Sequence, residues 1–141
     1  GIVKPSPDIG MYTSVETGDC SIRNAFAAND AVSFGSIINA YTQPFLLLYN
    51  HRKDRGYRME AFAKAIRQSA AKPVCIGVIG EHKKACARYM QRTTGIRAQA
   101  VERPKEWIQA QNVRHVLCAG NIKGEGRQFL EEMIEEARQN V

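Results

Sequence analysis

The sequence predicts an α/β fold with a mostly parallel sheet of about six strands and helices on both faces. Strand-like apolar runs alternate with helix-like segments along the chain, and short connections join them. The run at 44–50, PFLLLYN, is continuously apolar, as strands are in a parallel sheet that is covered on both faces. In 57–70 the apolar residues recur at i, i+3, i+4 and i+7, the spacing of an amphipathic helix.

The expected strands are the strand-like apolar runs, and the expected helices are the segments between them. The expected strands span 11–17, 20–27, 44–50, 73–80, 96–102 and 113–120. The expected helices span 33–42, 57–70, 81–95, 103–112 and 127–140. Ser33 is the expected N-cap of the first helix, Gly95 is expected to end the third, and Pro104 is tolerated in the first turn of the fourth.

The length and composition fit one folded domain. At 141 residues the chain can bury about two-thirds of its unfolded surface. Its 44% hydrophobic and 24% charged residues are ordinary globular values and exclude a disordered chain. Residues 1–10 hold Pro and Gly without periodicity, so we interpret them as a linker or truncated end and 11–141 as a single domain. No apolar run approaches the ~20 residues of a membrane span and no signal peptide is recognised, so a soluble chain is expected.

The four cysteines do not form a metal-binding motif. No pair has C-x-x-C spacing, and the three histidines do not complete a zinc site. Cys75 and Cys118 lie within strand-like apolar runs, where cysteine usually serves as a small buried hydrophobe. Free cysteines make a reducing, cytoplasmic compartment the default expectation.

The net charge of +6 indicates an anionic partner, and part of the positive charge is concentrated in one segment. Residues 51–58, HRKDRGYR, hold four cations, whereas the C-terminal segment is acidic. A basic surface for RNA would explain this charge. The aromatic residues are few and are not interleaved with the cations as a base-stacking surface requires, so no nucleic acid partner is expected.

Three polar loops follow expected strands, at 24–30, 50–58 and 119–126. Ligands bind at the carboxyl ends of the strands in sheets of this kind, so we expect all three loops along one edge. The last loop contains several glycines, which fit either a tight turn or a close backbone approach to an anion at a helix N-terminus. The arginines of the middle loop fit either phosphate or carboxylate recognition or a solvated charged loop.

Two common catalytic arrangements are missing from the sequence. There is no G-x-x-x-x-G-K-[ST] segment to hold a triphosphate and no G-x-G-x-x-G match. No serine or cysteine stands in a motif with a histidine base, so no catalytic residue is predicted. The residues alone therefore predict an α/β domain with an anion-binding edge.

Taken together, the loops resemble the C-terminal domain of the poly-γ-glutamate synthase ligase subunit, a relative of the Mur ligases. The resemblance rests on N-A-F-A-A-N-D at 24–30, N-H-R-K-D-R-G-Y-R at 50–58 with Phe62-Ala63 after it, and G-N-I-K-G at 120–124. It extends over roughly residues 18–139 in order and spacing. It implies a Rossmann-like fold of the Mur ligase C-terminal-domain type.

The resemblance also implies an activity, poly-γ-glutamate (capsule) biosynthesis. Such an enzyme is an ATP-dependent amide ligase that activates a carboxylate as an acyl phosphate, with Mg²⁺ assisting. A central P-loop domain, absent here, would bind ATP and Mg²⁺, so this fragment alone is expected to be inactive. The implied partners are glutamate or the polyglutamate chain, that central domain, and membrane subunits at the cytoplasmic face. Self-association into a homo-oligomer stays open.

The resemblance assigns site residues by position, with no catalytic residue and no metal ligand among them. Asn24, Asn29 and Asp30 would face the nucleotide and the acyl phosphate. General Mur ligases usually carry Asp at the first of these positions, and the synthase often has His where this chain has Lys123. The residues expected to bind an anion or the acceptor amino acid are Arg52, Asp54, Arg55, Arg58, Asn121 and Lys123. The alternative is a non-catalytic α/β module that binds an anionic polymer, RNA or polyglutamate, through its basic loop.

Overall fold

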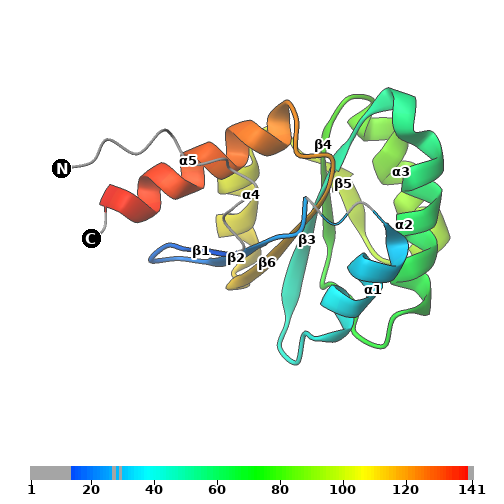
Figure 1. The fold of residues 1–141 in the computed structure, drawn as a ribbon, viewed down its shortest axis with the longest axis horizontal. Helices are drawn as coiled ribbons and strands as arrows, with labels where there is room; N and C mark the ends of the chain where they lie inside the picture. The colour runs from blue at the N-terminus through cyan, green and yellow to red at the C-terminus, as the bar shows by residue number, and fades with distance from the viewer. Residues whose placement is uncertain (1–13, 27, 29, 140–141) are drawn as a thin grey trace.

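A six-stranded sheet in the order β1-β2-β6-β3-β4-β5 forms the centre of the molecule (Figure 1). The computed structural model describes residues 14–26, 28 and 30–139, so the linker expected at 1–10 lies outside the described residues. Only β1 runs antiparallel, to β2, and the other neighbouring strands pair in parallel. The strands are β1 (Ser14–Glu16), β2 (Ser21–Asn24), β3 (Phe45–His51), β4 (Ile76–Gly80), β5 (Ala98–Ala100) and β6 (His115–Gly120). The predicted mostly parallel sheet is confirmed.

Helices cover both faces of this sheet, as predicted. The helices are α1 (Ala31–Asn39), α2 (Gly56–Gln68), α3 (Lys83–Thr94), α4 (Pro104–Gln111) and α5 (Glu125–Gln139), with a short 3₁₀ turn, η2 (Lys53–Arg55), before α2. One hydrophobic core joins α1, α2 and α3 to one face, and a second core joins α4 and α5 to the other (Figure 1). Among the described residues, no helix is long and apolar enough to cross a membrane.

Strand β3 lies between β6 and β4 and is buried along its whole length. Its side chains alternate between the two cores: Leu46 and Leu48 contribute to the α4–α5 side, and Leu47 and Tyr49 to the α1–α2–α3 side. This double coverage explains why the sequence of β3 is continuously apolar and not alternating.

The ends of three helices test the capping predictions. Gly95 adopts a left-handed conformation (φ 76°) at the end of α3, and Pro104 is the first residue of α4, as expected. The prediction for Ser33 is wrong. The N-cap of α1 is Asp30, whose carboxylate accepts the backbone N–H of Ser33 at 2.7 Å and its hydroxyl at 2.9 Å. Both residue types cap helices well, and the helix begins two residues earlier than its apolar spacing indicated.

Replacement of Asp30 should therefore weaken α1. Hydrogen bonds from Ser33 lower the pKa of the Asp30 carboxyl, so its contribution to stability is present above about pH 4 and is lost as the pH falls through the lowered folded-state pKa. We expect Asp30→Ala to lower Tm by a few degrees at neutral pH. Asp30→Asn keeps a capping oxygen and should keep Tm near that of the parent, with a smaller loss on acidification. Equal Tm values for the parent and Asp30→Ala in thermal unfolding at pH 7 would contradict this.

All four cysteines are buried, and none forms a disulfide. Cys118 lies in β6 and Cys75 directly precedes β4, which confirms their expected role as small buried hydrophobes. Burial raises the pKa of the Cys86 thiol to about 12, and it also raises the pKa of Cys118. These thiols therefore stay protonated at ordinary pH and are poor nucleophiles.

Cys86 should consequently resist alkylation in the folded protein. A pKa of about 12 in place of 9.0 lowers the thiolate fraction at pH 8 about a thousandfold. Iodoacetamide labelling followed by mass spectrometry should show slow modification of the native protein and rapid modification in guanidinium. Rapid native labelling at Cys86 would show that this part of the core opens readily.

Candidate functional site at the carboxyl edge

The three predicted loops lie along one edge of the sheet, as expected. They follow β2, β6 and β3, which are neighbours in the sheet and run in the same direction. The loops after β2 and β3 lead to helices on one face, whereas the loop after β6 leads to α5 on the other face (Figure 1). Loops that diverge in this way leave a crevice between them, the usual ligand position in open α/β sheets.

The first loop uses its polar side chains to hold its own backbone. The side chain of Asn24 is buried, and its Oδ1 accepts the backbone N–H of Phe26 at 3.1 Å. Asp30 is exposed and caps α1. Asn29 lies outside the described residues. Asn24 and Asp30 are thus at the predicted edge, and each has a structural role there that does not depend on a ligand.

The arginine loop contains an arginine nitrogen without a hydrogen-bond partner. Arg52 pairs with Asp54, with 3.3 Å between Nε and Oδ1, so Asp54 neutralises one of the arginines. Nη1 of Arg55 lies 3.5 Å from the Tyr57 hydroxyl, but its Nε is buried and has no partner among the described residues. Arg58 is half-buried in the first turn of α2. A buried guanidinium N–H without an acceptor is a donor that an anion can satisfy.

The N-terminus of α2 adds to this positive potential. No side chain caps it, and its first turn contains no acidic residue. Free backbone N–H groups and the helix dipole favour an anion at such an end, while the neighbouring arginines are unfavourable there unless an anion is bound. This loop therefore combines free backbone N–H groups with positively charged side chains.

Asn50, at the end of β3, is a site residue that sequence reasoning did not select. Its side chain is 2% exposed, and its Nδ2 donates to the backbone oxygens of Asn121 and Lys123, the latter at 2.7 Å. The backbone oxygen of Asn50 also accepts the N–H of Asn121 at 2.9 Å. Asn50 therefore fixes the loop after β6 against the end of β3.

The hydrogen bonds to Asn50 position Asn121 and Lys123, the two predicted site residues of the loop after β6. Oδ1 of Asn121 accepts the backbone N–H of Lys123 at 2.8 Å, which closes a local turn, and the Lys123 side chain is exposed. Gly120 has a φ of 94°, and a Cβ there would collide with the backbone oxygen of Asn50. A Cβ at Gly126 would lie 2.5 Å from Nδ2 of Asn50. These two glycines are therefore needed for close approach within the protein, and the tight-turn interpretation holds for this loop.

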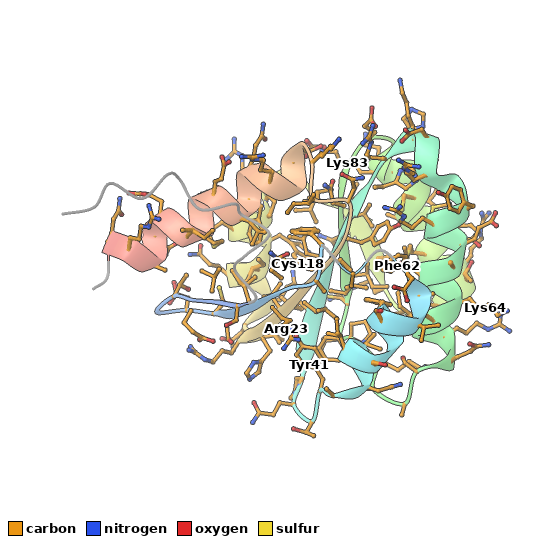
Figure 2. The ribbon with its side chains drawn as sticks, in the orientation of Figure 1. Arg23, Tyr41, Phe62, Lys64, Lys83 and Cys118 are labelled. Carbon is orange, nitrogen blue, oxygen red and sulfur yellow. The ribbon has the colours of Figure 1, made fainter. Side chains whose placement is uncertain are left out.

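A fourth loop, after β4, contributes charged groups that were also not predicted. Lys83 is labelled in Figure 2. Its Nζ lies 3.0 Å from Glu125 and 3.2 Å from Glu102, and Glu125 also accepts the backbone N–H of Gly80 at 2.9 Å. Burial would lower the pKa of Lys83, but the hydrogen bonds to both glutamates outweigh this effect and raise it. Lys83 is thus a permanent cation that ties the first turn of α3 to that of α5.

His51 completes the set of buried polar groups at this edge. Its Nδ1 donates to the backbone oxygen of Glu81 at 2.8 Å, and its Nε2 is buried without a partner among the described residues. The roles of His51 and Lys83 were not predictable from the sequence, because their partners lie on other loops and belong to no local motif.

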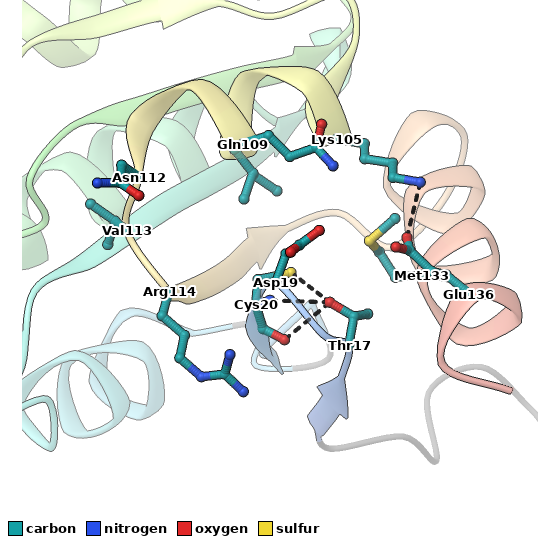
Figure 3. A pocket seen from close by; sticks show the side chains of 11 residues that line it. Thr17, Asp19, Cys20, Lys105, Gln109, Asn112, Val113, Arg114, Met133 and Glu136 are labelled. Atoms are coloured by element: carbon teal, nitrogen blue, oxygen red, sulfur yellow. Dashed lines mark hydrogen bonds and ion pairs between the residues drawn. The ribbon is translucent and has the colours of Figure 1, made fainter. Parts of the chain in front are cut away.

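A separate hollow lies at the opposite end of the sheet, between α4, α5 and the β1–β2 hairpin (Figure 3). Its volume is about 430 Å³, and its walls include Cys20, Arg114, and the Lys105–Glu136 ion pair. No predicted site residue lines it. The convergence of loops, arginines and unpaired polar atoms makes the carboxyl edge the better candidate site.

The fold and the strand-end loops define a Rossmann-like α/β domain. A family model described as the poly-gamma-glutamate synthase CapB C-terminal domain matches residues 12–136, and the chain belongs to this family. Among solved structures, folylpolyglutamate synthase from Thermotoga maritima is similar, with a TM-score of 0.64 and 15% sequence identity. That match covers 94% of this chain and 33% of the synthase chain, and at this identity it concerns the fold. No curated protein matches the chain.

Proposed function

We propose that this chain is the C-terminal domain of an ATP-dependent amide ligase that forms γ-glutamyl bonds through an acyl-phosphate intermediate. The unpartnered Nε of Arg55, at the uncapped start of α2, is the observation that supports this most directly. A transferred phosphoryl group and the carboxylates of glutamate are both anions that a guanidinium recognises. The family match over residues 12–136 supplies the poly-glutamate context.

The proposed contribution of the domain is positioning. In such a ligase the amine of the acceptor attacks the acyl phosphate, the new amide bond forms, and phosphate leaves. Closure of this domain over the site would exclude water from the acyl phosphate and align the amine. An edge of arginines, asparagines and backbone N–H groups suits that task, because it needs no nucleophile of its own.

The three loops are proposed to face different parts of the bound substrates, the nucleotide with its phosphates on one side and the acceptor amino acid on the other. We propose that the loop after β2, with Asn24, Asn29 and Asp30, faces the nucleotide. The arginine loop would bind phosphate or carboxylate oxygens, and the loop with Asn121 and Lys123 would face the acceptor amino acid. ATP and Mg²⁺ would be bound mainly by a central domain, since no P-loop segment occurs in this sequence.

The partners and location belong to the same proposal. The domain would act on glutamate or the growing chain, dock against the central ATP-binding domain, and work with membrane subunits of the synthase at the cytoplasmic face. The chain spans 33% of the structurally similar synthase, which is consistent with one domain of a larger enzyme.

Deletion of this domain from the complete ligase tests the proposal. Removal of residues 14–139 should abolish ATP-dependent polymer formation, while the remaining domains still bind ATP. Continued polymer formation by the truncated enzyme would refute the assigned role. A titration of ATP into the 141-residue chain should show no tight binding, and micromolar affinity would contradict the division of labour proposed above.

A further inference from the structure

A row of cations without ion-pair partners lies on the outer surface of α3. Lys84, Arg88 and Arg92 stand at i, i+4 and i+8, so they share one side of the helix at intervals of about 6 Å along its axis. All three are exposed, and none makes an ion pair with another residue in the part of the chain that the structure describes. Like charges at this spacing disfavour the helix, so an anion lying across the row would stabilise it.

The neighbouring helix α2 carries two further exposed cations on the same face of the sheet. A hollow of about 490 Å³ between α2 and α3 is lined by Lys64 and Arg67, and Glu60 is the only acidic residue that the described part of the chain contributes to it. Both cations are exposed, and Lys64 points outward from α2, away from the sheet (Figure 2). By contrast, the acidic residues of α5 gather on the other side of the sheet, at Glu131, Glu132, Glu135 and Glu136. We call Lys64, Arg67, Lys84, Arg88 and Arg92 the basic track.

The basic track leads away from the candidate site. Helices α2 and α3 follow β3 and β4, so both begin at the carboxyl edge and run back along the same face. Lys84 lies in the first turn of α3, beside that edge, and Arg92 lies in its last turn. A linear anion that leaves the site could therefore contact the cations of the track in succession.

We propose that the basic track binds the γ-linked polyglutamate chain as it extends from the site, an inference that rests on the proposed ligase function. Each γ-linked residue keeps one free α-carboxylate, so the chain is a polyanion. An extended α-peptide residue spans at most ~3.6 Å, and the two further methylene carbons of a γ-linked residue increase this to about 6 Å. The carboxylates thus repeat at about the spacing of the cations on α3. Several weak contacts on one chain would reinforce each other.

Two other anionic partners fit the basic track less well. Single-stranded nucleic acid needs aromatic rings for base stacking, and the hollow offers only the half-buried Tyr89. Firm binding to an anionic membrane surface usually combines cations with apolar side chains that enter the lipid. The large exposed apolar side chains of the described residues are Val32, Tyr57 and Val74, and none of them lies on α3.

The test compares two triple variants of the 141-residue chain. Lys84→Gln/Arg88→Gln/Arg92→Gln removes the row on α3. The matched control, Arg103→Gln/Lys105→Gln/Arg127→Gln, also removes three positive charges. They come from the N-cap of α4, from α4 and from α5. Glutamine is a good helix former, so both proteins should fold, which circular dichroism checks. Binding of labelled poly-γ-glutamate, long enough to span α3, is followed by fluorescence anisotropy at low and physiological salt.

We expect the α3 variant to bind the polymer about tenfold more weakly than the parent, and the matched variant to bind as the parent does. Affinity should fall with salt, and free glutamate at equal carboxylate concentration should not compete. Equal losses in the two variants would overturn the inference, because they would reflect net charge alone. Tighter binding of an oligonucleotide or of anionic vesicles through the same three residues would overturn the assignment of polyglutamate. The binding assay needs no ATP, so an absence of polymer binding would leave the ligase proposal standing. Conversely, if the domain deletion did not abolish polymer synthesis, the measured binding of poly-γ-glutamate could still be interpreted.

Discussion

Replacement of Arg55 by alanine in the complete ligase should lower polymer synthesis about a hundredfold, the scale on which removal of one preorganised donor reduces turnover. Arg55 lies in the loop that follows β3. Its Nε is buried, and no described residue accepts a hydrogen bond from this nitrogen. Its removal would cost the folded protein little, because the contact of its Nη1 with the Tyr57 hydroxyl is long, at 3.5 Å. The loss should therefore appear in catalysis and not in Tm.

Two further substitutions define what Arg55 contributes. Arg55→Lys keeps the charge but not the planar fork, so its activity should fall between those of the parent and the alanine variant. Arg114→Ala removes an exposed arginine from the other end of β6, where it pairs with Glu16, and should leave synthesis unchanged. Polymer formation and ADP release are measured together. Normal synthesis by Arg55→Ala would remove this loop from the active site.

Asn50→Ala should reduce the free energy of unfolding by about 3 kcal/mol, because two backbone oxygens lose their buried donor at once. Those oxygens belong to Asn121 and Lys123, which lie 71 and 73 residues away in the sequence. For a domain of this size the loss corresponds to a decrease in Tm of about 10 °C. Chemical denaturation gives the free energy directly, and hydrogen exchange should show faster opening of the loop after β6.

The variant Asn50→Asp separates hydrogen bonding from packing. Aspartate has nearly the same shape as asparagine, but its carboxylate cannot donate to a carbonyl oxygen. If the side chain of Asn50 stabilises the loop through its N–H groups, the aspartate variant should be at least as unstable as the alanine variant. A stable Asn50→Asp protein would show that packing, not donation to Asn121 and Lys123, holds the loop.

The periodicity of the sequence predicted the layers of the fold and the position of the loops. Continuous apolar runs defined β3, β4 and β6, and an i, i+3, i+4, i+7 pattern defined α2, because burial imposes these spacings directly. The convergence of the loops followed from the parallel direction of the strands. The order of the strands did not follow, since nothing local places β6 between β2 and β3.

The contacts within the site were harder to predict for a related reason. Asn50 stood in the segment that carries the family resemblance, yet its partners come from the end of another strand. Lys83 and Glu125 meet only because β4 and β6 bring α3 and α5 to the same edge. The prediction of Ser33 as the N-cap was wrong because Asp30, three residues earlier, also accepts hydrogen bonds well, and the position of the helix boundary decides which residue caps.

The position of β6 also determines when this domain can fold during synthesis. β2 and β3 each pair with β6 and not with each other, so the β1–β2 hairpin and the β3–β4–β5 unit join only through β6, which is synthesised after the other described strands of the sheet. Until then β2 and β3 present open hydrogen-bonding edges and an incomplete apolar face, a state prone to mispairing. Completion of the sheet therefore depends on a segment near the C-terminus, and this same segment brings Asn121 and Lys123 to the candidate site.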